Sequence, residues 1–421
     1  MLYNVSMKQT NIKQKRNIAI IGGGASGLFL AKRLCDAGFG VCVYERAERL
    51  GKKLSATGNG QGNITNSEVA RAEYFSVSKS GGAVYDIIKQ YDDKAVVSFF
   101  GELGVLLYFD DRGRAYPTGR QASALTDALR LYLQEKGVET RLSMFVTSVK
   151  KQGERFVLTA KTLDGEERFY ADTVVFCTGG KAQKNFGTDG SAYACIRALG
   201  HTVTELYPSL VQLKTDTRYI KTLKGIRAAD VMLTASYEKD GKKKTARVRG
   251  DVIFTEYGVS GDAVFRISAF ITDVLEGGVT LTVDFLPDCD EEQIVLAIEN
   301  KRAKLPSLAQ SEWLGGLVHN QIGRAIAKRL QTEESKRLAG GVKEFTLTVT
   351  GSLGFDYAQV TKGGVPLCEV TDGLQSKKHK GLYFAGETLD VDGQCGGFNL
   401  QWAFASANVV ADEIIKDRGQ V

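Results

Sequence analysis

Residues 18–45 constrain the fold of this chain most, because they read as a strand, a glycine turn, a helix and a second strand. The apolar run IAII at 18–21 is typical of a strand buried on both faces of a parallel sheet. Residues 26–37 carry apolar side chains at helical spacing, Gly38 follows as a stop, and 41–44 predict the second strand. This βαβ pattern predicts an α/β fold that binds an adenine dinucleotide.

The glycines of the turn have separate tasks in such a site. Gly22 permits the tight turn, Gly24 lets the backbone approach a diphosphate, and Gly27 lets the helix pack on the strand. The free amides at the helix start, including those of Ala25 and Ser26, would hold the diphosphate together with the positive end of the helix dipole. Glycine turns at such junctions can also serve packing alone. Here the strand, the helix, its glycine stop and the following acid all fit a dinucleotide-binding unit.

An acid and a polar loop follow this unit. Glu45 ends the second strand and is placed to accept hydrogen bonds from the adenosine ribose. Residues 52–66, KKLSATGNGQGNITN, contain too much Gly and Asn for a regular element and predict a loop with a special backbone that runs along the cofactor. A flexible surface loop is the alternative. The candidate cofactor contacts after Glu45 are Arg46, Lys53, Thr57, Gly58, Gly60, Asn63 and Thr65.

Further elements complete the predicted sheet. Residues 119–137 predict a helix, and 139–149 predict a strand that contacts the adenine through its backbone, with Val146 as the candidate. The apolar strand 173–177 is closed by Thr178, Gly179 and Gly180. These three residues lie where open α/β sheets bind ligands, outside the carboxyl ends of the strands.

The C-terminal segment supplies the other half of the predicted site. Residues 381–385 predict a short strand, Gly386 and Glu387 follow it, and a helix runs from about 398 to 416. In FAD proteins of this architecture the acid contacts the ribityl or diphosphate region, and the helix N-terminus points at the flavin N1–C2=O edge, where the reduced flavin is negative. The candidate contacts at the helix start are Gly397, Phe398, Asn399 and Leu400.

A different pattern separates these cofactor segments. Residues 206–285 predict short antiparallel strands, 291–339 look helical with a break at Leu305-Pro306, and 345–349 return to strand. We therefore predict an FAD-binding domain (18–205 and 366–421), a β-rich substrate domain (206–290 and 342–365) and a helical subdomain (291–341). The insertion lacks a second GxGxxG, so NADH or NADPH would bind only transiently as the electron donor.

Composition indicates an ordinary globular protein. The 421 residues are 43% hydrophobic, yet no apolar stretch reaches the roughly 18 residues of a membrane span. Residues 1–17 are polar and basic, which predicts a disordered lead-in and no signal peptide. Seven cysteines without a CxxC pair or a Cys/His cluster predict neither disulfides nor a metal site, and favour the cytoplasm. The net charge of +6 is spread along the chain, so we expect no nucleic-acid or membrane partner.

Several longer motifs resemble one family. IAIIGGGASGL, ERAERLGKKLSATGNGQGNITN, RAYPTG, VVFCTGGKA with GTDGSAYACIRALGH, DVIFTEYGVSGDAVF and GLYFAGETLDVDGQCGGFNLQWAFASA follow in order across residues 18–415. Together they are similar to the YhiN/BaiN-like FAD-dependent oxidoreductases, which include aminoacetone oxidase-like flavoproteins. The resemblance implies FAD and an α/β Rossmann-type domain, like that of two-dinucleotide-binding-domain flavoproteins. It also implies an antiparallel β-barrel-like domain inserted in this domain, and a small helical domain.

Two motifs depart from the family pattern. The loop pattern GRCNxTN reads GQGNITN here, with Gln61 and Gly62 at the Arg and Cys positions. The pattern FTHxGxSGP reads FTEYGVSGD, with Glu256 and Asp262 at the His and Pro positions. Because both segments are expected near the flavin and the substrate, the substrate of another member does not transfer to this chain.

The family resemblance suggests two functions, and we consider a third beside them. The leading hypothesis is an NAD(P)H-driven reductase of a conjugated C=C in an enone, such as a 3-oxo steroid or bile-acid intermediate, with hydride from flavin N5 and a proton from an acid. Tyr257 is the candidate acid, although packing between domains is the commoner role of such a residue. The alternatives are an oxygen-using, aminoacetone-type amine oxidase and an RNA-modifying flavoprotein. We expect a small-molecule substrate, and the sequence does not predict the oligomeric state.

Overall fold

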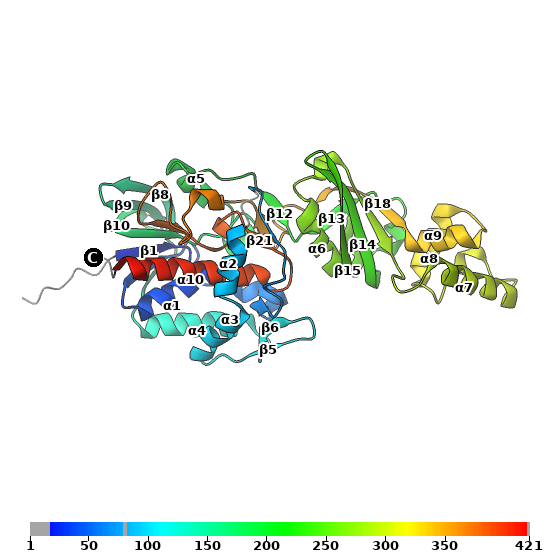
Figure 1. Cartoon of the computed structure of the whole chain (residues 1–421), viewed down its shortest axis with the longest axis horizontal. Coiled ribbons are helices and arrows are strands. Elements are labelled where there is room, and N and C mark those ends of the chain that lie inside the picture. The colour runs from blue at the N-terminus through cyan, green and yellow to red at the C-terminus, as the bar shows by residue number, and fades with distance from the viewer. Residues whose placement is uncertain (1–16, 79–81, 419–421) are drawn as a thin grey trace, which may run out of the picture.

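The computed structural model describes residues 17–78 and 82–418, which form an elongated molecule (Figure 1). A parallel sheet and the C-terminal helix lie at one end, a β-barrel lies in the middle, and three helices lie at the opposite end. Of the predicted lead-in, residues 1–16 lie outside the described residues, and Asn17 opens the first strand.

A five-stranded parallel sheet forms the centre of the first part, in the order β20-β11-β1-β2-β7. Its inner strands are apolar and buried because layers cover both faces. The strands are β1 Asn17–Ile21, β2 Gly40–Tyr44, β7 Glu139–Arg141, β11 Thr173–Phe176 and β20 Leu382–Phe384.

Helices cover one face of this sheet, and an antiparallel sheet covers the other (Figure 1). On the helical face α1 packs against α10 and α4. The opposite layer has the order β10-β9-β8, and α5 packs on β8. The helices are α1 Ala25–Asp36, α4 Ala122–Glu135, α5 Ala192–Ala198 and α10 Phe398–Arg418, and the strands are β8 Phe145–Gln152, β9 Arg155–Thr162 and β10 Gly165–Ala171.

The prediction of a single strand at 139–149 is wrong in one respect. The structure divides it into β7 of the parallel sheet and β8 of the antiparallel sheet. The division occurs where Ser143 adopts a φ of +54°, which interrupts the extended backbone.

Short elements connect the loop after β2 to the start of α10. A small sheet has the order β3-β6-β5, and β4 pairs with β21. Because β3 also packs against α10, this loop lies beside the C-terminal helix. The elements are β3 Thr65–Asn66, β4 Tyr74–Phe75, α2 Gly82–Gln90, α3 Asp93–Glu102, β5 Leu107–Phe109, β6 Arg114–Pro117 and β21 Asp392–Gly393.

The inserted part is a closed antiparallel barrel of the order β13-β16-β15-β14-β17-β18, which confirms the predicted barrel-like insertion. Alternate residues of β14, such as Leu233 and Ala235, are buried in its core. The elements are β13 Leu213–Thr215, β14 Arg227–Lys239, β15 Lys242–Phe254, β16 Gly258–Ser260, α6 Asp262–Ile271, β17 Val279–Asp284 and β18 Phe345–Ser352.

A two-stranded antiparallel ribbon, β12 Tyr207–Ser209 with β19 Val360–Lys362, joins the barrel to the first part. At the far end lie α7 Glu291–Lys304, α8 Asn320–Leu330 and α9 Ser335–Lys343. Helix α7 begins with a capping box at Asp290 and ends before Pro306, where a break was predicted. The domain boundaries given above stay predictions.

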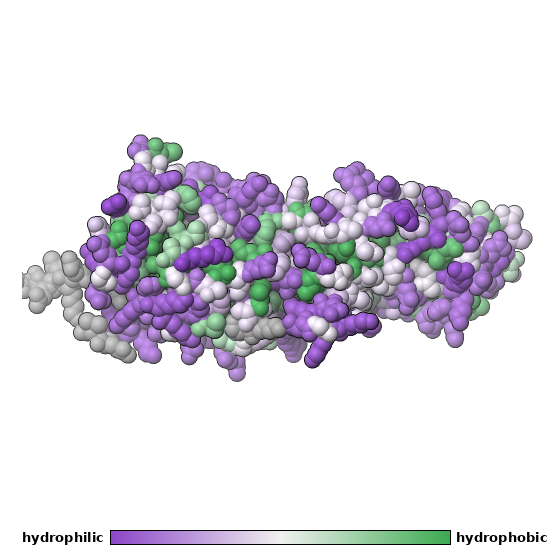
Figure 2. Space-filling view, turned by 90° about the horizontal axis from the view of Figure 1, so that it is seen from above, coloured by the Kyte–Doolittle hydropathy of each residue, from purple (hydrophilic) through white to green (hydrophobic). Residues whose placement is uncertain are grey.

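The face of the protein seen in Figure 2 is largely polar. Figure 2 shows one face covered mostly by hydrophilic residues, with hydrophobic residues in small patches between them. Within residues 17–78 and 82–418, no helix has both the length and the apolar character needed to cross a membrane.

Candidate functional site

The glycine turn between β1 and α1 forms one wall of a cavity of about 1050 Å³. Gly22 has a φ of +104°, and a Cβ there would lie 2.4 Å from the Cys177 carbonyl oxygen. A Cβ on Gly27 would lie 2.0 Å from the Gly22 carbonyl oxygen, so this glycine allows α1 to pack on the turn. At Gly24 a Cβ would meet no protein atom within 4 Å. Gly24 therefore leaves open space where a ligand can approach the backbone.

The N-terminus of α1 points its unpaired amides at this space. The first helical hydrogen bond runs from Leu28 N to Gly24 O at 3.0 Å, so the amides of residues 25–27 precede it. Ala25 and Ser26 line the cavity. Free amides and the positive end of the helix dipole suit a diphosphate.

Glu45 lies at the end of β2, beside the turn. Its Oε2 accepts a hydrogen bond from Gly23 N at 2.7 Å, and its Oε1 accepts one from Ala47 N at 2.8 Å. Burial raises the pKa of Glu45, and these two backbone amides oppose that shift. Each oxygen keeps a second lone pair that can accept a ribose hydroxyl.

Arg46 follows Glu45 and lines the part of the cavity where we expect the adenine. Its guanidinium lies 4.8 Å from the Phe145 ring centre and pairs with Asp189 at 2.8 Å. Burial would raise the pKa of Asp189, but hydrogen bonds from Ser191 and the contact with Arg46 outweigh it and lower the pKa. Val146 lines the cavity beside Phe145, as the expected adenine contact requires. Asp189 lies in the motif GTDGSAYACIRALGH, but sequence reasoning did not single it out.

The loop after β2 has the special backbone that was predicted. Residues Leu54–Gly60 form 3-10 turns in which Gly58 and Asn59 adopt φ values of +58° and +53°. A Cβ on Gly58 would lie 2.9 Å from Asn63 N. Thr57, Gly58 and Asn63 line the cavity, and Gly60 does not.

Lys53 and Glu387, both predicted as cofactor contacts, form an ion pair at 2.9 Å with each side chain about one-fifth exposed. Glu387 Oε1 also accepts a hydrogen bond from Thr361 N at 2.8 Å. A Cβ on Gly180 would lie 2.3 Å from Thr361 Oγ1 and 2.8 Å from Glu387 Oε1. The end of β11, with Thr178, Gly179 and Gly180, thus meets the acid after β20 at the cavity wall.

A second helix N-terminus borders the same cavity. The first helical bond of α10 runs from Gln401 N to Gly397 O, which leaves the amides of residues 398–400 without an intrahelical acceptor. Gly397 has a φ of +100°, and its N donates to the Asn63 side chain at 3.1 Å. The Asn399 side chain binds the Gly393 backbone N and O at 2.8 Å each, so it fixes the turn before the helix. Phe398, Asn399 and Leu400 line the cavity.

Three further predicted residues support the wall from behind. Gly27 packs α1 on the turn, and Thr65 is buried and bonded to Gln401 on α10. Gly386 N donates to Ser406 Oγ at 2.9 Å, and Gly386 O accepts from Trp402 Nε1 at 3.1 Å, which ties α10 to the end of β20.

The structure does not bring Tyr257 to the cavity. Tyr257 lies in the turn between β15 and β16, where its carbonyl accepts a hydrogen bond from Thr215 N at 3.1 Å. It is absent from the cavity wall that the described residues form. Glu256 beside it is mostly exposed and pairs with Lys224, so this altered motif position also lies on the barrel surface.

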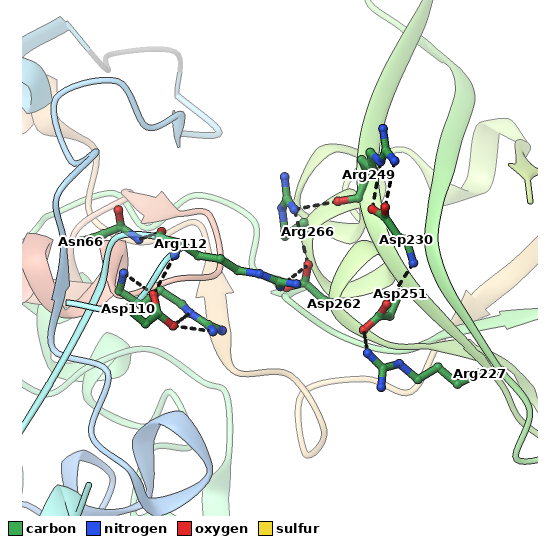
Figure 3. A network of polar contacts seen from close by, with 10 residues as sticks. Asn66, Asp110, Arg112, Arg227, Asp230, Arg249, Asp251, Asp262 and Arg266 are labelled. Atoms are coloured by element: carbon green, nitrogen blue, oxygen red, sulfur yellow. Dashed lines mark hydrogen bonds and ion pairs between the residues drawn. The ribbon is translucent and has the colours of Figure 1, made fainter. Parts of the chain in front are cut away.

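The cavity continues from the loop after β2 to the barrel, where sequence reasoning named few residues. Tyr108 and Tyr116 face each other across the β5–β6 hairpin with ring centres 5.9 Å apart. Figure 3 shows Arg112, from the turn of this hairpin, extending towards Asp262 at the start of α6. Tyr116 lies in the motif RAYPTG, and Asp262 lies in the altered motif FTEYGVSGD, which was expected near the flavin and the substrate. The wall residues of this part include Tyr108, Asp110, Arg112, Arg114, Tyr116, Arg120, Leu210, Asp262, Phe265, Arg266 and Cys395.

Cys395 lies in this wall as a neutral thiol, because burial raises its pKa to about 11. Among the described residues no group of three or more His, Cys, Asp or Glu side chains could hold a metal ion.

These parts fit FAD. Two helix N-termini and an acid after β2 border one cavity, and Gly24 leaves room for a ligand to approach its backbone closely. Small-molecule sites usually occupy about 300–1,000 Å³, so this cavity is large enough for an extended cofactor. The fold and the site define a Rossmann-type flavoprotein.

The comparisons place the chain more closely. Residues 16–413 match the family described as HI0933-like protein Rossmann domain, and the chain belongs to this family of FAD-dependent oxidoreductases. It is 36% identical to a 3-dehydro-bile acid delta(4,6)-reductase of Clostridium scindens, over 92% of this chain and 96% of the relative. It is 27% identical to a ribosomal RNA dihydrouridine synthase of Haemophilus influenzae, over 93% and 96%.

A solved structure supports the fold alone. The 3-ketosteroid-delta4-(5alpha)-dehydrogenase of Rhodococcus jostii RHA1, in complex with 4-androstene-3,17-dione, aligns with a TM-score of 0.51. The alignment covers 96% of this chain and 99% of that chain at 15% identity.

Proposed function

We propose that this protein is an FAD-dependent reductase of a conjugated C=C bond in an enone, with a 3-oxo steroid or bile-acid-type compound as its substrate class. The observation that carries the proposal is the 36% identity to the bile acid delta(4,6)-reductase over nearly the whole length of both chains. The cavity supports it, because it continues past the cofactor segments to a wall at the barrel where Tyr108, Tyr116 and Phe265 lie among charged side chains.

In this account bound FAD supplies the hydride that the reduction needs. The chain supplies binding and orientation. The N-termini of α1 and α10 hold negative charge, Glu45 accepts the ribose hydroxyls, and the ion pair of Lys53 with Glu387 borders the middle of the cofactor. NADH or NADPH is the proposed electron donor, bound transiently.

Tyr116 replaces Tyr257 as our candidate proton donor to the α-carbon. Its side chain is largely buried and lines the cavity, and its hydroxyl has no hydrogen-bond partner among the described residues. Tyr116 Cε1 lies 3.6 Å from the position of a Cβ on Gly58, so its ring borders the cofactor loop. Burial raises the pKa of this phenol, and the nearby Arg114 opposes the shift. A protonated phenol can donate to a developing enolate.

Ribosomal RNA is the second candidate substrate. Two relatives, 27% and 25% identical over almost all of this chain, are ribosomal RNA dihydrouridine synthases. The C5=C6 bond of uracil is conjugated to a carbonyl, so its reduction needs the same hydride and proton as an enone. This candidate differs from the first in the size and charge of the substrate and keeps the same site chemistry.

The test is an anaerobic absorbance screen of the FAD-loaded enzyme. NADH or NADPH should bleach the flavin, and a 4-ene-3-one steroid should restore its colour, while the matching saturated 3-ketone should not. Recovery with uridine-containing ribosomal RNA alone would favour the second candidate. Recovery that needs air, with peroxide formed from a small aminoketone, would replace both by an amine oxidase.

A further inference from the structure

One face of the β5–β6 hairpin forms part of the cavity wall. Tyr108 pairs directly with Tyr116 across the hairpin. Next to this pair, Asp110 N donates a hydrogen bond to Arg114 O at 3.0 Å. Because alternate residues of a strand point to the same face, these four side chains share one face, and all four line the cavity. Ala115, which points the other way, is not among the described residues of this wall. The hairpin therefore presents an acid, a cation and two phenols to one space.

Asp110 fixes the position of the Arg114 side chain. Its Oδ1 accepts hydrogen bonds from the backbone amides of Arg112 and Arg114 at 3.0 and 2.9 Å, which holds the carboxylate at the turn (Figure 3). Its Oδ2 lies 2.8 Å from Arg114 Nε and 2.6 Å from Nη2. Burial would raise the pKa of Asp110, but the hydrogen bonds from Arg114 and the backbone outweigh it and lower the pKa. The guanidinium is thus held along one edge, and its Nη1 bonds to no residue that the structure describes.

The charge held in this way lies beside Tyr116, two residues further along β6. Arg114 Cζ is 5.8 Å from the Tyr116 ring centre. Burial raises the pKa of the Tyr116 phenol, and Arg114 opposes this rise. The other titratable or charged groups on this side are Asp110 and Tyr108 on the hairpin, Arg120 over the Tyr108 ring, and Cys395 before α10. Asp110, Tyr108 and Cys395 all raise the pKa of Tyr116 further, so Arg114 is the group that works against them.

We propose that Arg114, held by Asp110, is a positioning residue for Tyr116, and that its charge stabilises the phenolate that Tyr116 becomes when it protonates the α-carbon. The inference rests on the proposed function and deepens it. The phenol O–H bond breaks, a C–H bond forms at the α-carbon, and the O–H electron pair stays on the phenolate oxygen. The β-carbon takes the hydride from reduced FAD, so the C=C bond is reduced and the flavin is oxidised. Water in the cavity then returns a proton to the phenolate. A buried anion is costly unless a cation lies close to it, and an arginine stays charged throughout.

The first test measures the phenol itself. Tyr116 is replaced by difluorotyrosine, whose phenol is more acidic, and fluorine NMR follows its titration in the oxidised holoenzyme. Arg114→Gln should raise the titration midpoint by about one pH unit or more, because a cation within about 4–6 Å lowers the pKa of an acid by that much. Arg114→Lys keeps the charge and should stay closer to wild type. Arg130→Gln is the control and should leave the midpoint unchanged, because Arg130 lies on α4, pairs with Asp127 and is not among the described residues that line the cavity.

A second measurement links this pair to the reaction. Reduced holoenzyme is mixed without air with a 4-ene-3-one steroid at neutral pH. Arg114→Gln should slow flavin reoxidation by about 3- to 10-fold, because a weaker acid gives up its proton more slowly. In a Tyr116→Phe background the same change should have little further effect, since the phenol through which Arg114 acts is gone.

The two measurements separate this inference from the proposed reaction. A raised midpoint in an enzyme that reduces no enone would support the coupling of Arg114 to Tyr116 and refute the proposed function. An unchanged midpoint in Arg114→Gln, an equal rise in Arg130→Gln, or an undiminished effect of Arg114→Gln in the Tyr116→Phe background would overturn the inference.

Discussion

The substitution Gly24→Ala tests the cofactor site without disturbing the fold. Gly24 has a φ of −81° and a ψ of −163°, which alanine adopts readily, and its added Cβ would meet no protein atom within 4 Å. The new methyl group instead enters the cavity at the start of α1, where we place the diphosphate. Crowding a close contact by one methyl group costs about 1–3 kcal/mol. FAD affinity should therefore fall by about 10- to 100-fold.

The assay is titration of the apoprotein with FAD, followed by flavin fluorescence, with urea unfolding of each apoprotein alongside. Gly340→Ala is the matched control, because Gly340 lies in α9, a Cβ there also meets no atom within 4 Å, and it is remote from the cavity. The control should keep wild-type FAD affinity and gain up to about 1 kcal/mol of stability. Wild-type FAD affinity in Gly24→Ala, or unfolding at clearly lower urea, would refute this placement of the diphosphate.

Two other predictions concern single groups. In anaerobic stopped-flow mixing, Tyr116→Phe should slow reoxidation of the reduced flavin by an enone about 100-fold or more, because it removes the proposed proton donor. Cys395→Ser should change this rate little. A large effect of Cys395→Ser with little effect of Tyr116→Phe would instead identify the Cys395 thiol as the proton donor. Burial raises the pKa of Asp392 to about 7, so between about pH 4 and pH 7 the native state holds a proton that the unfolded state releases, and stability falls as pH rises. Asp392→Asn should remove this slope and raise the unfolding free energy by up to about 4 kcal/mol at pH 8, by about 1.5 kcal/mol at pH 5, and by almost nothing at pH 3. If wild type and Asp392→Asn lost stability equally as the pH rises, the pH dependence could not be due to Asp392.

The cofactor half of the site could be predicted because its signals are local. The tasks of Gly22 and Gly27 follow from the strand, turn and helix within one short stretch, and the structure shows the close backbone contacts that need them. The same holds for Gly58, whose positive φ fits the predicted special loop. In each case the backbone conformation depends on a neighbouring segment, and the composition and spacing of the sequence predict the structure of that segment.

The substrate half could not be predicted, because tertiary contacts create it. Tyr108 and Tyr116 belong to a short hairpin with no functional pattern of its own beyond RAYPTG. They reach the cavity because β6 pairs with β3 and the barrel brings α6 opposite the hairpin. Tyr257 shows the reverse case. Its motif resembles a segment expected near the flavin, yet the β15–β16 turn lies on the barrel away from the cavity wall.

The central claim is that this flavoprotein reduces a conjugated C=C bond. The most direct measurement is a single turnover without air, in which the fully reduced holoenzyme is mixed with a 4-ene-3-one steroid and the product is identified by mass spectrometry. We predict one saturated 3-oxo product, two hydrogens heavier than the substrate, for each FAD reoxidised. Unchanged substrate with the flavin still reduced, or reoxidation only after air is admitted, would contradict the claim.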